Sequence, residues 1–298
     1  MLKEFISDRN LSPSSIRNYA SAVRIYEELN NKTLKELIDE AEREELEKIR
    51  WKDRKIRKRL INYRSYLYKN KVETTAVKYL TNIQTIYRHF EIELHTLPTF
   101  RSKQINKSKE IKFKDLPTKE NIQDACKIAD EVTELIILFI TTSGLSKIEI
   151  LNLTVEDFIK ANKSEIPTFY LTRKKTAKEF FTFTTPKTAK KIMSHIKKHN
   201  LKRNDKLFSI SASSLTKNMA KINDQLNLGR INNYSRFRCH MLRKYHASNF
   251  LNNTSFTIDE IDCLQGRSKN KIHRSYFIND EEKLKEKYMN HIDVIDIK

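Results

Sequence analysis

Residues 239–250 read CHMLRKYHASNF, and this stretch is the most informative part of the chain. Its His240 and Arg243 are three positions apart, so on a helix they share one face, where both can hold non-bridging oxygens of one phosphate. Arg267 follows downstream, and Tyr276 comes nine residues after it. A tyrosine close to a phosphate that fixed cations surround is a candidate nucleophile that needs no metal. The stretch therefore predicts a site that handles phosphate.

The chain as a whole is strongly basic. Its 298 residues include 58 Lys and Arg against 38 Asp and Glu, which gives a formal net charge of +20 at pH 7. Such a chain is expected to bind a polyanion by counterion release, and we expect the partner to be double-stranded DNA. The alternative is a Lys-rich protein without a nucleic-acid partner, since an AT-biased genome also produces much Lys, Asn and Ile.

Glycine is scarce, because only Gly144, Gly229 and Gly266 are present. This excludes a Gly-rich phosphate loop and a dinucleotide fingerprint, so we expect no ATP, NAD or other cofactor. Gly144 and Gly266 fall inside the segments that carry the site and predict tight turns there. Gly229 is interpreted as an ordinary helix stop.

Cysteine use and hydropathy indicate where the chain works. The three cysteines are Cys126, Cys239 and Cys263, an odd and widely spaced set that predicts a reducing cytoplasm without disulfides. Cys239, Cys263, His240, His246 and His273 could be considered as zinc ligands, but their spacing fits no paired-ligand pattern, so we expect no metal. No apolar run reaches the ~20 residues that span a bilayer, and the N-terminus does not begin a signal peptide, so we expect no membrane partner.

Residues 1–97 are predicted to form a helical DNA-binding domain. Ser12 and Pro13 form an N-cap with a first-turn proline, and apolar residues then recur at helical spacing. Eight of the twelve residues in 48–59 are basic, whereas a solvated helix face usually mixes its signs. Trp51 in this run could stack on a base or pack in the core, and packing is favoured. The cations expected to contact the DNA backbone are Lys48, Arg50, Lys52, Arg54, Lys55, Arg57, Lys58 and Arg59.

A second domain, 119–298, is predicted to follow a basic linker at 98–118, which lacks periodicity and apolar content. An apolar helix at 135–140 precedes two β-rich runs, 168–172 and 180–184, which predict a hairpin with a basic tip. The predicted fold is therefore mainly α with a small antiparallel sheet, in two domains. The linker cations expected to lie against phosphates are Lys103, Lys107 and Lys109.

In this order and spacing the segments resemble the tyrosine recombinases of the phage-integrase and Xer type, and the resemblance is sharp from residue 143 to 276. The family's H-x-L-R motif is matched by His240 to Arg243. Its G-H/W turn corresponds to Gly266, where Arg267 departs from the pattern by standing in place of His or Trp, which retains a donor and adds charge; its nucleophilic tyrosine, nine residues later, is matched by Tyr276. The resemblance implies a two-domain clamp on DNA, with Arg243, His240 and Arg267 as phosphate ligands.

The predicted hairpin carries the family's catalytic lysine. Residues 175–179 read KTAKE and resemble its K-G-x-K-E motif, so Lys175 takes the place of the general acid. Lys174 and Lys178 are alternatives for that role and otherwise phosphate contacts, as is Arg274 beside the nucleophile.

A second motif also departs from the family pattern. The box that resembles G-L-R-x-x-E-L-x-x-L reads GLSKIEILNL at 144–153, which places Ser146 at the first catalytic arginine. A variant register gives Lys147 that place instead. Lysine offers a point charge where arginine offers a two-pronged fork, so the resemblance implies a slow enzyme.

The resemblance also implies the reaction and its assembly. Tyr276 would form a 3′-phosphotyrosine without metal or nucleotide. The chain would be a monomer in solution and a homotetramer on DNA. It would be cytoplasmic, and associated with the nucleoid when bound to DNA. The tail 280–289, with Leu284 and Tyr288, is expected to be too small for a core and to dock on a neighbouring protomer. The alternatives are a recombinase relative that only binds DNA sites and a type IB topoisomerase-like nicking-closing enzyme. Tyr288 and Tyr245 are the rival tyrosines, and Tyr245 is expected to serve packing.

Overall fold

The computed structural model describes residues 1–100, 109–173, 177–267 and 280–297. The chain divides into two compact units, Met1–Lys109 and Glu110–Lys298, and the division falls within the segment predicted as a linker. The predicted residues that lie outside the described part are Lys103, Lys107, Lys174, Lys175, His273, Arg274 and Tyr276.

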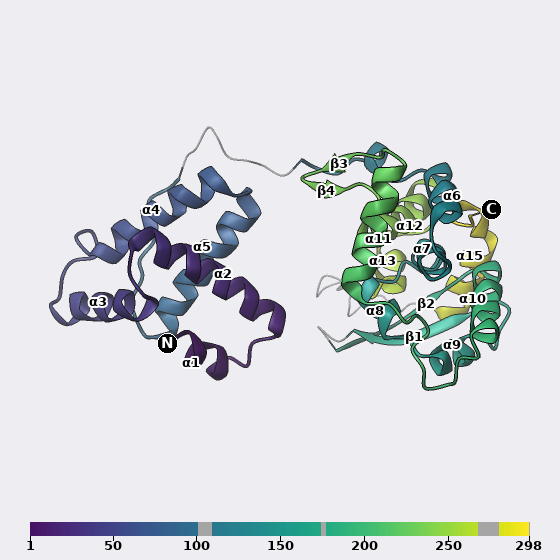
Figure 1. The fold of residues 1–298 in the computed structure, drawn as a ribbon, viewed down its shortest axis with the longest axis horizontal. Coiled ribbons are helices and arrows are strands. Elements are labelled where there is room, and N and C mark those ends of the chain that lie inside the picture. The colour runs from purple at the N-terminus through teal and green to yellow at the C-terminus, as the bar shows by residue number, and fades with distance from the viewer. Residues whose placement is uncertain (101–108, 174–176, 268–279, 298) are drawn as a thin grey trace. The chain divides into compact units, whose positions relative to one another are not determined.

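The described part of the first unit contains five α-helices and no strand. Ser12 caps α2 by accepting a hydrogen bond from the Ser15 amide, with proline in the first turn as the sequence predicts. Thr33 and Glu36 form a capping box at the start of α3, so two orphan amides of that helix are satisfied. The helices are α1 (Leu2–Asp8), α2 (Pro13–Asn30), α3 (Leu34–Leu46), α4 (Lys55–Asn70) and α5 (Glu73–His89) (Figure 1).

Three tyrosines form the centre of the first unit's core. Tyr26, Tyr63 and Tyr87 are fully buried, and the hydroxyls of Tyr26 and Tyr87 lie 3.1 Å apart. The Tyr63 hydroxyl donates to the Ala22 carbonyl at 2.9 Å. Because each buried hydroxyl has a partner, the rings contribute apolar area without an unpaired oxygen. Trp51 is partly buried and packs against this core, which is the role favoured from the sequence.

The second unit is mainly helical with two short hairpins (Figure 1). Its elements as far as β2 are η1 (Phe113–Asp115), α6 (Lys119–Ile128), α7 (Glu131–Ser143), α8 (Lys147–Asn152), α9 (Val155–Ala161), β1 (Thr168–Arg173) and β2 (Lys178–Phe183). The later ones are α10 (Pro186–Lys198), α11 (Ala212–Gln225), β3 (Arg230–Ile231), β4 (Tyr234–Ser235), α12 (Cys239–Asn253), α13 (Ile258–Leu264), α15 (Glu281–Asn290) and η2 (Ile292–Val294).

Helix α7 lies at the centre of this unit. Its residues from 135 to 143 are all buried, as expected for a helix that is apolar on every side. Helices α6, α10 and α12 pack against it. It ends at Gly144, whose φ of +65° is a left-handed conformation that suits glycine. The apolar run of the sequence therefore becomes the axis on which the rest of the unit packs.

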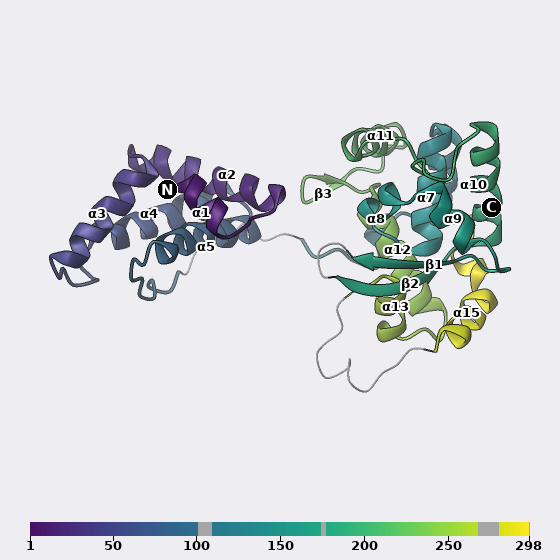
Figure 2. The same ribbon diagram turned by 90° about the horizontal axis from the view of Figure 1, so that it is seen from below.

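The β1–β2 hairpin confirms the sheet predicted from the sequence. The strands pair antiparallel, from Thr168 opposite Phe183 to Arg173 opposite Lys178. Helix α9 packs against β1 and α13 against β2 (Figure 2). The β3–β4 hairpin was not predicted, because it is only two residues long on each side; its turn uses Asn232 and Asn233 at positive φ. Among the described residues no helix is long and apolar enough to cross a membrane.

The expectation for the C-terminal tail was wrong. Leu284 and Tyr288 of α15 are buried within the same chain, in a cluster that includes Phe183 and Phe250. The Tyr288 hydroxyl donates to the Thr142 carbonyl at 2.9 Å. The two side chains suffice because the core they join is already built by the sheet and α12, which the tail's own pattern does not reveal.

Candidate functional site

Arg243 is the most firmly held residue of the predicted site. Helix α12 carries it, and only 7% of its side chain is exposed. Its Nη1 donates to the Gly144 carbonyl at 2.6 Å and its Nη2 to the Gln265 carbonyl at 2.5 Å. The guanidinium therefore joins the turn after α7 to the end of α13, and its position is fixed by two backbone oxygens.

The charge of Arg243 is only partly balanced. Burial lowers its pKa to about 10, Glu149 opposes this shift, and the neighbouring Arg173 and Arg267 add to it. Glu149 Oε2 lies 3.4 Å from Arg243 Nη1. Arg243 thus stays protonated at neutral pH, in a place where other cations gather and an anion would be stabilised.

His240 lies one turn before Arg243 on α12. Partial loss of water around its ring, followed by the charges of nearby Lys244, Arg238 and Arg243, lowers its pKa below the usual value. The imidazole is therefore neutral at pH 7 and can accept or donate a hydrogen bond. It lines a cavity of about 330 Å³ together with Arg243, Ser146 and Lys147. The structure thus brings the H-x-L-R residues and the box at 144–153 together.

A buried polar cluster supports this arrangement, and the sequence did not reveal it. A Cβ at Gly144 would lie 2.7 Å from His246 Nδ1 and 2.8 Å from Gln265 Nε2, so only glycine fits. Gln265 Nε2 donates to the Arg243 carbonyl and lies 3.0 Å from His246 Nδ1. Burial lowers the pKa of His246 to about 3, so its neutral ring accepts that hydrogen bond. The cluster holds Gln265, and with it the carbonyl that Arg243 contacts.

The turn predicted at Gly266 is present, with a φ of +60°. Arg267 projects from it, 40% exposed, and its Nη1 lies 3.5 Å from Asp262 Oδ1. Lys178, at the start of β2, donates its Nζ proton to the Arg267 carbonyl. The hairpin thus reaches the turn through one of the two alternatives for the general acid, while Lys175 and Tyr276 lie outside the described residues.

The two registers of the box place different side chains. Ser146 is the N-cap of α8, where its amide donates to Glu149 Oε2 at 2.7 Å. Lys147 Nζ donates to the Ala212 carbonyl at 3.1 Å and to Thr216 Oγ1 at 2.8 Å, both on α11. In neither register does α8 supply a guanidinium.

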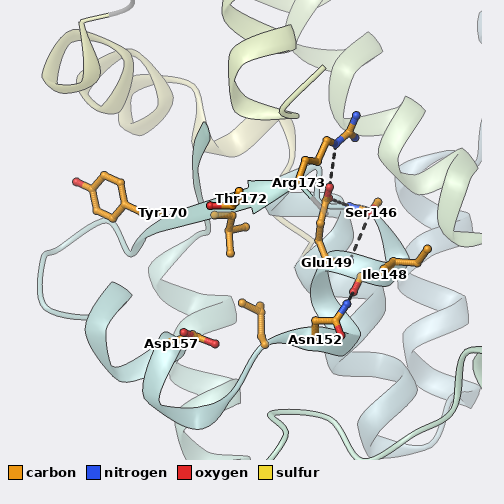
Figure 3. Close-up of a pocket in the computed structure, with 10 residues that line it drawn as sticks. Ser146, Ile148, Glu149, Asn152, Asp157, Tyr170, Thr172 and Arg173 are labelled. Carbon is orange, nitrogen blue, oxygen red and sulfur yellow. Dashed lines mark hydrogen bonds and ion pairs between the residues drawn. The ribbon is translucent and has the colours of Figure 1, made fainter. Parts of the chain in front are cut away.

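Arg173, at the end of β1, is a site residue that the sequence reasoning missed. Its Nε donates to Glu149 Oε1 at 3.1 Å and its Nη2 to the Gln265 carbonyl at 3.4 Å. Figure 3 shows the side chain beside Glu149 and Ser146 on the wall of a second cavity, of about 550 Å³. The one sequence signal was its place at the end of a β-rich run, directly before the basic tip.

The rival tyrosines are both part of the core. Tyr288 is fully buried, and burial raises its pKa well above 10. Tyr245 is also buried, with a pKa raised to about 12. Neither hydroxyl is placed to meet a DNA phosphate, and the packing role expected for Tyr245 agrees with its burial.

The basic run of the first unit splits into exposed and internal cations. Lys48, Arg50, Lys52 and Lys58 are exposed, as is Lys109 outside the run, and Arg57 is half-buried. Arg54 is buried, with its Nη1 2.7 Å from Glu45 Oε1 and its Nε donating to the Ile49 carbonyl. Arg59 and Lys55 both pair with Glu40 of α3. The expectation that Arg54 contacts DNA is therefore not kept, because its charge is used inside the unit.

One group among the described residues has the make-up of a metal site. Glu131, His195 and His199 bring ligand atoms within 4.8 Å of one another. The Lys198 ammonium also contacts Glu131, at 2.6 Å, and these partners lower the pKa of Glu131 to about 2. A metal ion would have to displace that ammonium, so the group is a salt-bridge cluster in this structure.

Comparison with known proteins identifies the fold. No protein-family model and no curated protein matches the sequence. The Tn1549 transposon integrase in complex with circular intermediate DNA matches with a TM-score of 0.61 and 11% identity over 98% of both chains. A lambda integrase dimer bound to a COC′ core site matches with a TM-score of 0.58 and 11% identity, over 93% of this chain and 95% of that one.

A third match comes from the Xer group. XerH site-specific recombinase bound to its difH substrate matches with a TM-score of 0.55 and 17% identity, over 77% of this chain and 69% of that one. The three are tyrosine recombinases, and at these identities the likeness is one of fold. The chain has the tyrosine recombinase fold, mainly helical with a small antiparallel sheet.

Proposed function

We propose that this chain is a site-specific DNA recombinase that cuts and rejoins DNA through a 3′-phosphotyrosine. The observation that carries the proposal is the meeting of Arg243 and His240 with the α8 box at one cavity, with Arg267 close enough to lower the pKa of Arg243, in a fold that is similar to DNA-bound integrases. The residues come from segments far apart in sequence, and packing alone does not require two arginines beside a neutral imidazole at one place.

The proposed reaction is an in-line displacement at phosphorus. The Tyr276 phenol loses its proton to water, and its oxygen forms a bond to the scissile phosphorus. The bond from phosphorus to the 5′-oxygen breaks, and that oxygen takes a proton from Lys175. Arg243, His240 and Arg267 stabilise the negative charge that gathers on the non-bridging oxygens. The second step reverses the first with a different 5′-hydroxyl, so the energy of the broken bond is kept in the phosphotyrosine.

Lys178 is the described alternative for the proton donor. Its ammonium contacts the Arg267 carbonyl, beside the phosphate ligands, so it is close enough to act if Lys175 does not. Loss of proton donation to the 5′-oxygen in Lys175→Ala would support Lys175 as the general acid. Loss of proton donation in Lys178→Ala alone would support Lys178.

The proposed partner is double-stranded DNA, held by the exposed cations of the first unit and by the site. We propose a monomer in solution, a tetramer on DNA and association with the nucleoid. A lambda integrase tetramer bound to a Holliday junction, with a TM-score of 0.56, supports the assembly part of this proposal. Because α15 packs on its own chain, we expect another surface to join the protomers, and cross-linking on DNA tests this.

A binding-only relative is the second candidate, and Ser146 at the arginine position is the observation that favours it. One experiment separates the possibilities. Duplexes that bind the protein are selected from a random pool and incubated with it in chelator. Exchange of strands between two duplexes supports a recombinase, and relaxation of supercoiled DNA without exchange supports a topoisomerase-like enzyme. Binding without cleavage of either substrate supports the binding-only relative.

A further inference from the structure

The α8 box leaves one phosphate ligand unfilled. Ser146 is short and its hydroxyl caps α8 by accepting from the Glu149 amide, and the Lys147 ammonium is bound by two oxygens of α11. A transition state with charge on two non-bridging oxygens is stabilised best by forked donors on both sides. A second guanidinium must therefore come from another element if the site is to be complete.

Arg173 lies beside Arg243 and shares its acceptors. The Glu149 carboxylate takes Arg173 Nε on one oxygen at 3.1 Å and Arg243 Nη1 on the other at 3.4 Å. The Gln265 carbonyl takes an Nη2 nitrogen from each arginine, at 3.4 and 2.5 Å. Those two nitrogens are therefore no farther apart than the sum of these distances, about 6 Å.

The pair of arginines carries an excess of positive charge. Glu149 can balance only one of the two guanidiniums, and Arg267, a third cation near Arg243, is paired with Asp262. Two guanidiniums repel each other at such a distance unless an anion joins them. Arg173 keeps 26% of its side chain exposed, and its Nη1 has no partner among the described residues. The Arg173 guanidinium is thus held through Nε and Nη2, and its Nη1 is the donor that an anion can use.

The hairpin end directs Arg173 to this place. Arg173 and Lys178 are opposite each other in the β1–β2 register, so their side chains lie on one face of the hairpin. Arg173 contacts the Gln265 carbonyl and Lys178 the Arg267 carbonyl, so both reach the same three-residue turn. Figure 3 shows Arg173 rising from the strand past Glu149.

We propose that Arg173 is a catalytic residue that supplies, from strand β1, the guanidinium missing from Ser146. This inference rests on the proposed function. Arg173 and Arg243 hold two non-bridging oxygens of the scissile phosphate, with Glu149 fixing the spacing of their forks. Lys147 remains bound to α11 and takes no part.

The test measures the rate of covalent adduct formation on a nicked duplex. Arg173→Ala is expected to slow adduct formation by about 10²–10³-fold, as losing one oxyanion donor does. Affinity for DNA should change far less, because many other phosphate contacts remain. Arg203→Ala, which removes an exposed arginine of the same unit, is the matched control and should leave the rate unchanged.

Two further arms separate a phosphate ligand from a structural arginine. A scissile methylphosphonate has one neutral methyl in place of a charged oxygen, so it should restore much of the rate to Arg173→Ala. Ser146→Arg should restore the rate in Arg173→Ala but add little to the wild type. Loss of activity that neither arm restores, or an Arg173→Ala rate within about threefold of the wild type, overturns the inference. A wild type that forms no adduct overturns the proposed function itself, and the inference with it.

Discussion

Glu149→Gln is a demanding test of the site's electrostatics. The carboxylate contacts Arg173 at 3.1 Å and Arg243 at 3.4 Å, and it also accepts the Ser146 amide in the capping box. Glutamine keeps the shape and an acceptor oxygen for the cap, but it removes the charge that separates two guanidiniums. The substitution therefore tests the charge balance with little change in packing.

The expected loss of stability follows from the two pairs. An ion pair at about 4 Å contributes roughly 4 kcal/mol of gross attraction at an effective dielectric of 20. Arg243 is 7% and Arg173 26% exposed, so solvent screens the second pair more than the first. Transferring the Glu149 carboxylate from water into the fold offsets part of this attraction. Removal of one partner of a buried ion pair typically costs about 3–5 kcal/mol. We expect a net loss of about 3 kcal/mol, which for a unit of this size lowers Tm by roughly 6–12 °C.

Scanning calorimetry of the whole chain measures the Tm of Glu149→Gln and of the wild type, each with and without inorganic phosphate. Phosphate should raise the Tm of Glu149→Gln more than that of the wild type, because the unbalanced guanidiniums then bind the anion. Glu134→Gln is the control, since its exposed pair with Lys191 is worth at most about 1 kcal/mol. A Tm of Glu149→Gln within about 2 °C of the wild type would refute the charge argument.

Three other predictions concern residues that do not contact the scissile phosphate in the proposed reaction. The pKa of His246 is near 3 when folded and about 6.5 when unfolded, so its neutral form stabilises the fold fully above pH 6.5 and progressively less as pH falls. Between pH 7.5 and 5 the protonation of His246 should therefore lower the free energy of unfolding of the wild type by about 2 kcal/mol. Urea titrations should show a smaller pH-dependent loss in His246→Gln. Deletion of residues 280–298 should lower the Tm of the second unit even without DNA, because it opens a buried cluster; an unchanged Tm would restore the expectation of docking on a neighbour. Arg50→Ala should reduce the salt dependence of DNA binding by about one phosphate contact, whereas Arg54→Ala should mainly destabilise the first unit.

Local signals in the sequence predicted much of the fold. The N-cap at Ser12, the apolar run of α7 and the antiparallel pairing of residues 168–173 with 178–183 are set by residues close together in the chain. The face shared by His240 and Arg243 is likewise a consequence of helical spacing, and the structure places both at one cavity.

The parts that the sequence did not reveal depend on distant residues. Arg173 is 24 positions from Glu149 and 92 from Gln265, so no local spacing indicates their contact. Arg54 looks like its basic neighbours until Glu45 is seen beside it. In both cases the role of a cation is decided by the acid or carbonyl that the fold brings to it.

The central claim is tested most directly by mapping a covalent adduct. The full chain is incubated with a nicked duplex carrying its selected binding site, in chelator, and the DNA-linked peptide is identified by mass spectrometry. We predict that the wild type forms the adduct at Tyr276, and that Tyr276→Phe binds the duplex with near-normal affinity but forms none. An adduct that persists in Tyr276→Phe, or a wild type that binds and never forms one, would contradict the account.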